Sequence, residues 1–318
     1  MSESRRSAAR NAIEYAAYLA ARSIARRAGP RLVASLGAAL GTLYLAVGRR
    51  RRHVLHFNLE LIFPHMPVGE RRRLAREVAR HFGRVALDTL RIQGLSRQAI
   101  EREATIEGEE NLRHALSLGR GVFILSAHVG LWEVIPLTVG PRIPGGIAII
   151  HRPLDNPLLE REVVRLRTAF GNTLIGKGQI RRPVVRTLAA GGAVGILIDQ
   201  RALPDEGVEV PFFGHPAWTH VGLAKLALAT GAAVLPTFCL WQGPGAYLVE
   251  IGTPIVPADL GPELREPVAL TAHIMTIYEA VIRRYPSQWL WYHDRWREVR
   301  LRVEGQGAGG TGTKQSRT

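Results

Sequence analysis

One segment pairs a histidine with a carboxylate that could orient it for proton transfer, and it reads Ser-Ala-His-Val-Gly-Leu-Trp-Glu from Ser126 to Glu133. A carboxylate that accepts from one imidazole nitrogen fixes the tautomer, so that the other nitrogen can remove a proton from a hydroxyl. Residues five apart on a regular helix point about 140° away from each other. His128 and Glu133 can therefore meet only if His128 lies on a turn before the helix, with Gly130 easing the bend. We predict that His128 is the general base and Glu133 its orienting partner, although this spacing alone also fits a structural hydrogen-bonded pair.

The elements that must position this segment alternate between short apolar runs and helical patterns from residue 121 onward. This alternation predicts an α/β domain with a central, mostly parallel sheet flanked by helices, which we place at residues 49–304. The expected strands are residues 121–126, 146–150, 193–198, 232–240 and 247–251. Helices are expected at residues 218–230 and 267–284, and another begins at Asn156-Pro157, where asparagine can cap the helix and proline can take its first position.

Charged residues follow three of the expected strands, at the point where each strand ends. His128 follows the first strand, Arg152 the second, and Asp199 and Arg201 the third. In open α/β sheets, ligands bind outside the carboxyl ends of the strands. We therefore predict that Arg152, Asp199 and Arg201 bind substrate beside His128. A salt bridge between Arg152 and Asp199 that only holds this edge together is the alternative.

The N-terminal region combines apolar and arginine-rich stretches. Residues 11–47 predict two helices broken at Gly29-Pro30, and the uncharged stretch 32–48 is near the lower limit of the roughly 17–25 residues that a spanning helix needs. We predict amphipathic, membrane-associating helices at residues 1–48, and we favour interfacial or core helices over a spanning one. The arginine run 49–52 follows and could contact anionic headgroups. Residues 305–318 are rich in Gly, Thr and Ser and are predicted to be a disordered tail.

The whole chain is basic, with 42 Lys and Arg residues against 27 Asp and Glu residues and a formal net charge of +15. Such a charge attracts anionic partners, so an acidic membrane surface and nucleic acid both fit. A basic nucleic-acid-binding protein is the alternative from another class, although the arginines gather beside the apolar N-terminal third and no nucleic-acid-binding module is identifiable. A serine hydrolase is disfavoured, because no Gly-x-Ser-x-Gly elbow occurs in the sequence. The single Cys239 excludes an intrachain disulfide.

Several blocks occur in an order that covers roughly residues 15–300. The blocks are Asn58-Leu59-Glu60-Leu-Ile-Phe63-Pro64, His128-x4-Glu133, His151-Arg152-Pro-Leu-Asp155-Asn156-Pro157, Asp199-Gln200-Arg201, Val210-Pro-Phe-Phe-Gly214 and Tyr285-Pro-Ser-Gln-Trp289-Leu-Trp291-Tyr-His293-Asp-Arg295-Trp296. Together they resemble the lipid A late acyltransferases, a lauroyl/myristoyl acyltransferase family within the lysophospholipid acyltransferase superfamily. Matched blocks in this order are more specific than any one of them.

The resemblance implies an O-acyltransferase that moves a fatty acyl chain from acyl carrier protein or acyl-CoA to a hydroxyl of a glycolipid acceptor, a lipid A precursor. It implies a location at the cytoplasmic face of the bacterial inner membrane, and neither a metal nor a bound cofactor. On the matched positions, His128 becomes the base, Glu133 its partner, and Arg152 a contact for the reacting carbonyl or a substrate phosphate. Members often have a clear N-terminal span, whereas this region is short and interrupted by arginine. A related branch that acylates phosphatidylinositol mannoside fits the same blocks.

Overall fold

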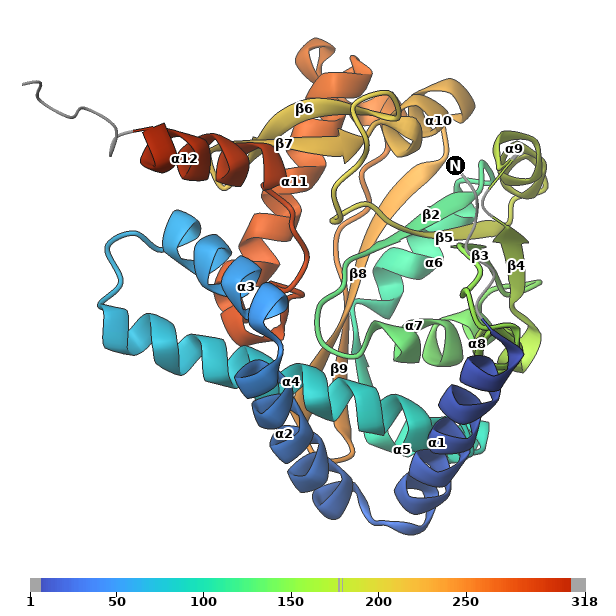
Figure 1. Ribbon diagram of the computed structural model, residues 1–318. Helices are drawn as coiled ribbons and strands as arrows, with labels where there is room; N and C mark the ends of the chain where they lie inside the picture. Colours follow the sequence, from blue (N-terminus) through green and yellow to red (C-terminus); the bar gives the residue numbers. More distant parts are fainter. Residues whose placement is uncertain (1–6, 177, 179, 310–318) are drawn as a thin grey trace, which may run out of the picture.

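The structure is a computed structural model that describes residues 7–176, 178 and 180–309 (Figure 1). Its strands are β1 (Ala104–Glu107), β2 (Val122–Ser126), β3 (Ile147–His151), β4 (Thr173–Gly176), β5 (Ala193–Leu197), β6 (Gly207–Phe212), β7 (His215–His220), β8 (Ala233–Gly243) and β9 (Ala246–Ile251). Its α-helices are α1 (Ala8–Arg27), α2 (Pro30–Val47), α3 (Arg49–Ile62), α4 (Val68–Ile92), α5 (Arg97–Glu103), α6 (Glu109–Ser117), α7 (Ile135–Thr138), α8 (Pro157–Arg167), α9 (Arg181–Ala189), α10 (Gly222–Thr230), α11 (Pro267–Arg284) and α12 (Arg297–Gly309).

The described residues form a seven-stranded sheet in the order β1-β9-β8-β2-β5-β3-β4, and β6 and β7 form a separate antiparallel hairpin. From β8 to β4 all neighbouring strands are parallel, whereas β9 runs antiparallel to β8 and β1 runs parallel to β9. The predicted α/β class, with a mostly parallel sheet flanked by helices, is confirmed.

The central strand β2 explains why unbroken apolar runs form this sheet. All five of its residues are buried. Because successive strand residues point to opposite faces, Phe123 and Leu125 pack with residues of α4, α9, α10 and α11, whereas Val122 and Ile124 pack with residues of α5, α6, α7 and α8. A parallel strand covered on both faces needs apolar residues at every position.

The N-terminal helices are packed onto the rest of the chain, and α2 lies against α4 through glycines. A Cβ on Gly41 would lie 1.8 Å from the carbonyl oxygen of Ala79, and one on Gly83 would lie 1.9 Å from the carbonyl oxygen of Gly37. This backbone approach is possible only without side chains at these positions. By length and composition, α2 could cross a membrane, and 28% of its residues are buried within the protein.

Most expected elements of the sheet match the structure. The expected strands 121–126, 146–150, 193–198, 232–240 and 247–251 correspond to β2, β3, β5, β8 and β9. The expected helix 267–284 is α11, and the side chain of Asn156 caps α8 by accepting from the backbone N–H of Leu158 at 3.0 Å. The break at Gly29-Pro30 separates α1 from α2.

Some expectations are wrong or incomplete. The helix expected at 218–230 begins only at Gly222, because the residues before it pair with β6 around a turn in which Phe213 and Gly214 have positive φ. The short strands β1 and β4 and the hairpin were not predicted. Helix α12 continues to Gly309, into the tail predicted to be disordered, and residues 310–318 lie outside the described residues.

Candidate active site

The loop after β2 carries His128 to the carboxyl edge of the sheet, beside the end of β5. Gly130 in this loop has a φ of +58°, and a Cβ there would lie 1.9 Å from the carbonyl oxygen of Cys239, so the bend requires glycine. His128 Nδ1 lies 2.9 Å from Asp199 Oδ1, and the His128 backbone N–H donates to Asp199 Oδ2 at 2.9 Å. Because an ionised carboxylate can only accept, the ring proton is on Nδ1 and Nε2 is an acceptor.

The carboxylate of Asp199 and the two strand ends are held from behind by the C-terminal part of the chain. Trp289 Nε1 donates to Asp199 Oδ2 at 2.9 Å. The buried hydroxyl of Tyr278 on α11 donates to the carbonyl oxygen of Ser126 at 2.7 Å and accepts from the backbone N–H of Ile198 at 3.4 Å. Tyr278 therefore joins the ends of β2 and β5, the strands that bring His128 and Asp199 together.

The electrostatics of this pair favour a basic imidazole and an ionised carboxylate. Burial on its own lowers the pKa of His128, but the charge and hydrogen bond of Asp199 outweigh burial, so that the pKa is raised from its usual 6.5. Burial alone would raise the pKa of Asp199, but the interactions with His128 and Trp289 lower it to about 2. Asp199 therefore stays ionised across the physiological range and supports proton uptake by His128.

Glu133 lies in a different set of contacts. It belongs to the short 3₁₀ turn Trp132–Val134 that follows the His128 loop. Arg167, the last residue of α8, donates through Nε to Glu133 Oε2 at 3.0 Å and through Nη2 to the other oxygen. Arg167 Nη1 is 2.7 Å from His151 Nδ1, and His151 Nε2 is 2.7 Å from Glu160. These contacts form a chain of hydrogen bonds and ion pairs along the carboxyl edge of the sheet.

His128 lines a cavity of about 440 Å³ at the carboxyl ends of β2, β3 and β5, which we call the strand-end cavity. Its apolar wall includes Ile124, Ile135, Pro136, Ile147, Ile149 and Ile196. Its polar lining includes Arg152, which is exposed, and Gln200, which is partly buried. Gln200 Nε2 lies 3.4 Å from His128 Nε2. Ser126, Glu133, His151 and Arg167 also line the cavity, so an apolar wall that suits a hydrocarbon chain adjoins polar groups that suit a reactive carbonyl.

Among the described residues, no group of three or more His, Cys, Asp and Glu side chains could hold a metal ion. Cys239 is fully buried, and burial raises the pKa of its thiol, which therefore stays protonated and unreactive.

The chain matches the family model described as bacterial lipid A biosynthesis acyltransferase over residues 3–298. It belongs to this family. It is 27% identical over 273 residues to the lipid A biosynthesis lauroyltransferase of Escherichia coli strain K12, covering 85% of this chain and 86% of the relative. It is 28% identical over 220 residues to the phosphatidylinositol mannoside acyltransferase of Mycobacterium tuberculosis strain H37Rv, covering 68% of this chain and 67% of the relative.

The crystal structure of the 1-acyl-sn-glycerophosphate acyltransferase from Thermotoga maritima aligns with 81% of this chain and 98% of that chain, at 17% identity and a TM-score of 0.36. Family membership by itself makes the protein an acyl-transferring enzyme with an acyl donor and a lipid acceptor. It also confirms the family resemblance that the ordered sequence blocks indicate.

In this member of the family, the predicted contact between Glu133 and His128 is corrected. The carboxylate on His128 Nδ1 is Asp199, because β2 and β5 are parallel neighbours with Ser126 opposite Leu197, so the residues that follow both strands lie side by side. The oxygens of Glu133 are instead engaged by Arg167. The catalytic roles of His128 and Glu133 themselves stay predictions.

The predicted substrate contacts also fall in different places. Asp199 is 1% exposed and is held by His128 and Trp289, so its position is that of an internal partner and not of a substrate contact. The Arg201 side chain pairs with Glu298, with Nε 3.0 Å from Oε1, which turns it toward the C-terminal helix. Arg152 is exposed at the strand-end cavity, where a substrate group can reach it.

The sequence interpretation missed Arg167, Gln200 and Trp289 as members of the site. Gln200 and Trp289 lie inside blocks that carried the resemblance, but neither is charged, and the interpretation weighed the charged members of those blocks. Arg167 gave no local signal, since it lies 34 residues from Glu133 in the sequence. A buried Glu133 does, however, require a cationic partner somewhere.

We predict that Asp199→Asn lowers kcat/KM by roughly 10²–10⁴-fold, the range for losing general-base catalysis. Only neutral His128 can accept a proton, so activity should be lost as the pH falls through its pKa, and this acid limb should lie above pH 6.5 in the wild-type enzyme. Without the Asp199 charge the pKa of His128 falls, so the residual activity of Asp199→Asn should show its acid limb at lower pH. The pH profile of kcat/KM measures both effects.

Glu133→Gln serves as the matched carboxylate-to-amide control for this prediction. It should displace the acid limb less than Asp199→Asn does, because Glu133 acts on His128 only through space. A larger displacement by Glu133→Gln would show that Glu133, and not Asp199, sets the basicity of His128.

Proposed function

We propose that the protein transfers a fatty acyl chain from acyl carrier protein or acyl-CoA to a hydroxyl of a lipid A precursor, with His128 as general base. The observation that most directly supports this is the position of His128, whose Nδ1 is held by Asp199 and which lines a cavity with an apolar wall. Relatives of this chain include lauroyl- and palmitoleoyltransferases of lipid A biosynthesis. The acceptor supplies the nucleophile, so no serine or cysteine of the protein is required.

The proposed reaction is a single displacement at the thioester carbonyl. His128 Nε2 takes the proton of the acceptor hydroxyl while the hydroxyl oxygen forms a bond to the carbonyl carbon. The tetrahedral intermediate then breaks its C–S bond, and the imidazolium returns the proton to the departing thiolate, which leaves as a thiol. Asp199 stabilises the imidazolium between these two steps.

Arg152 is proposed to contact the phosphate of the pantetheine arm that acyl carrier protein and acyl-CoA share. It is exposed at the strand-end cavity, and no described residue forms an ion pair with it. A donor that stabilises the oxyanion must be fixed before the reaction, and an exposed arginine side chain is not fixed in this way. A guanidinium can instead close on a phosphate with paired hydrogen bonds.

The cytoplasmic face of the bacterial inner membrane is the proposed location. Leu36, Leu43 and Val47 on α2 are 42%, 59% and 68% exposed, and the exposed Arg49 and Arg50 follow at the start of α3. Apolar area and arginines together bind an anionic surface more firmly than either does alone. We favour an interfacial α2, because its glycines lock it along α4, a helix that carries several arginines and is joined to the sheet domain.

A phosphatidylinositol mannoside is the second candidate acceptor. The mycobacterial enzyme that is named for this substrate is 28% identical to this chain, against 27% for the lauroyltransferase. Sequence similarity therefore favours neither acceptor, and the product analysis below includes both.

We predict that the purified enzyme, given acyl carrier protein thioesters or acyl-CoA, adds one acyl chain to a lipid A precursor, and that His128→Ala lowers the rate by roughly 10²–10⁴-fold. Mass spectrometry of the lipid products measures transfer to the lipid A precursor and to a phosphatidylinositol mannoside in separate reactions. Circular dichroism and the melting temperature confirm that the variant is folded. Near-normal turnover by folded His128→Ala would remove the mechanism, and no acylated product from either acceptor would remove the proposed function.

For Arg152→Gln we predict a rise of about tenfold in the KM for the acyl donor, with kcat and the acceptor KM nearly unchanged. The expected loss corresponds to one charge-assisted phosphate contact of about 1.5 kcal/mol. Arg161→Gln, an exposed arginine on α8 that does not line the cavity, is the control. A fall in kcat with an unchanged donor KM would show that Arg152 stabilises the oxyanion instead.

Membrane binding is expected to weaken in two separable ways. Replacing Arg49 and Arg50 with Gln should remove about 1 kcal/mol of binding each on phosphatidylglycerol-rich vesicles at low salt. Leu36→Ser with Leu43→Ser should weaken the part of the binding that persists at high salt. Vesicle sedimentation measures both, and Val268→Ser, which changes a 47% exposed residue on α11, is the control. Unchanged sedimentation of both variants would contradict the proposed attachment.

A further inference from the structure

A further cavity lies on the side of the N-terminal helices, and its lining includes Gln200, whose amide contacts the ring of His128. It holds about 620 Å³ between α2, α4 and residues 290–293, and we call it the helix cavity. We propose that the helix cavity binds the acyl acceptor, a lipid whose hydroxyl is presented to His128 past Gln200. This inference rests on the proposed acyl transfer and adds the place of the second substrate.

One residue beside the imidazole of His128 is common to the helix cavity and the strand-end cavity. Gln200 lines both cavities, and its amide lies 3.4 Å from His128 Nε2, the nitrogen that must face the acceptor hydroxyl. The ring of Trp132, in the strand-end cavity, is 5.0 Å from the ring of His128 and 6.5 Å from that of Phe82, in the helix cavity. A transfer between two substrates needs both reacting atoms beside the base at once. Two cavities that share Gln200, a residue next to His128, provide separate places for the two substrates.

The walls and entrance of the helix cavity suit a lipid. Its floor consists of small residues of α2 and α4, among them Gly41, Ala79 and Gly83. Leu40 and Tyr44 line the cavity and are each 46% exposed on α2, on the helix that presents the apolar surface proposed to meet the membrane. The cavity therefore opens where that apolar surface lies, so an amphiphile can enter sideways from the membrane without passing through water.

Two residues of the C-terminal segment, Tyr292 and His293, bring polar groups to the helix cavity. His293 Nε2 accepts from the backbone N–H of Arg201 at 2.8 Å, so the ring proton is on Nδ1 and can be donated. Burial lowers the pKa of His293 to about 4, which keeps the ring neutral and this tautomer in place. The hydroxyl of Tyr292, a residue that is only 6% exposed, is buried with no hydrogen-bond partner among the described residues. Buried polar groups normally have partners, and a hydroxylated headgroup would provide one.

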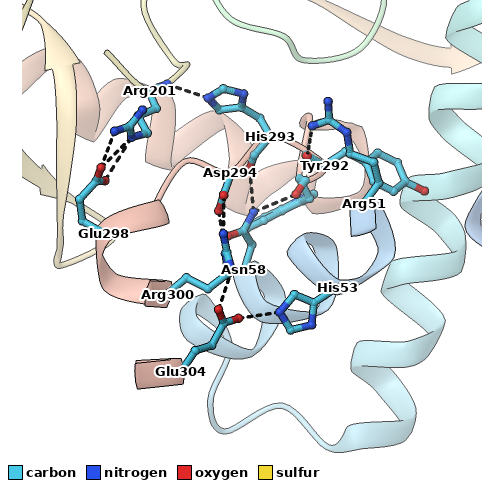
Figure 2. Close-up of polar contacts among 11 residues, drawn as sticks. Arg51, His53, Asn58, Arg201, Tyr292, His293, Asp294, Glu298, Arg300 and Glu304 are labelled. Carbon is cyan, nitrogen blue, oxygen red and sulfur yellow. Dashed lines mark hydrogen bonds and ion pairs between the residues drawn. The ribbon is translucent and has the colours of Figure 1, made fainter. Parts of the chain in front are cut away.

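The C-terminal segment that presents these groups is rigidly fixed (Figure 2). Asn58 of α3 donates to the carbonyl oxygens of Trp291 and His293 at 2.8 and 2.9 Å, and Arg51 donates to that of Tyr292 at 3.1 Å. These bonds join α3 to the segment that also contacts Asp199 through Trp289. The backbone of Tyr292 and His293 is therefore held in position before a substrate binds, and groups held in this way can orient a hydroxyl.

The test is to fill the helix cavity from its exposed rim. Ala86→Trp places an indole at an exposed lining residue of α4, and Leu40→Trp does so from α2, so neither variant disturbs the buried core. We expect each to raise the acceptor KM about tenfold or more, since one methylene too many already costs 10–200-fold in a fitted pocket. The donor KM and the slow hydrolysis of the donor thioester should be unchanged. Ala39→Trp, on an exposed α2 position outside the cavity, is the matched control and should behave as wild type.

An unchanged acceptor KM in both cavity variants would overturn the inference, and so would a rise in the donor KM alone. These outcomes differ from a failure of the proposed function, in which the wild-type enzyme acylates neither the lipid A precursor nor the phosphatidylinositol mannoside.

Photocrosslinking gives a readout that does not depend on turnover. A lipid A precursor and a phosphatidylinositol mannoside, each with a diazirine in one acyl chain, are irradiated with the wild-type enzyme in separate reactions. We expect one of them to label peptides that contain Phe82 or Leu290, both of which line the cavity. Labelling should fall in Ala86→Trp and persist in Ala39→Trp. Labelling confined to other peptides, or equal in the two variants, would overturn the inference.

Discussion

The buried carboxylate of Asp199 is the interaction on which the site depends. An ionised group that is 1% exposed is tolerated only when its oxygens are fully engaged. Asp199 is engaged by the backbone and ring of His128 and by the indole of Trp289. These donors come from the loop after β2 and from the C-terminal segment, so one charge ties together parts of the chain that lie 71 and 90 residues from it. The register of β2 with β5 and the hydroxyl of Tyr278 then decide where that charge lies.

Glu133, a second carboxylate near His128, influences the pKa of His128 together with Arg167. The charge of Glu133 raises the pKa of His128, whereas the charge of its partner Arg167 lowers it. The charge and hydrogen bond of Asp199 remain larger influences on this pKa than either of them. The contacts of Arg167 continue through His151, at the end of β3, to Glu160 on α8.

Sequence patterns predict much of this arrangement, and the elements and contacts that they do not predict are missed for identifiable physical reasons. Unbroken apolar runs predict β2, β3, β5 and β8, because strands covered on both faces need them. The rule that ligands bind at carboxyl ends of strands brings His128, Arg152 and Asp199 to one edge. Local patterns do not give the order of the strands. The sequence therefore points to Glu133, the carboxylate nearest to His128 along the chain, whereas Asp199 is the carboxylate that contacts it in space. Short strands such as Thr173–Gly176 have too few residues to show a pattern. The pattern also predicts a helix from Trp218, whereas residues 218–220 form the end of β7.

The position of Trp289 and Leu290 has a consequence for how the enzyme is made. Leu290 donates its backbone N–H to the carbonyl oxygen of His128, and Trp289 donates to Asp199. Both residues belong to the last tenth of the 318-residue chain. While the ribosome is still synthesising this end, Asp199 lacks one of its donors and the rear of the site is open. A chain interrupted before Trp289 contains every described strand of the sheet but lacks two donors, the indole N–H that Asp199 accepts and the Leu290 backbone N–H that the carbonyl oxygen of His128 accepts.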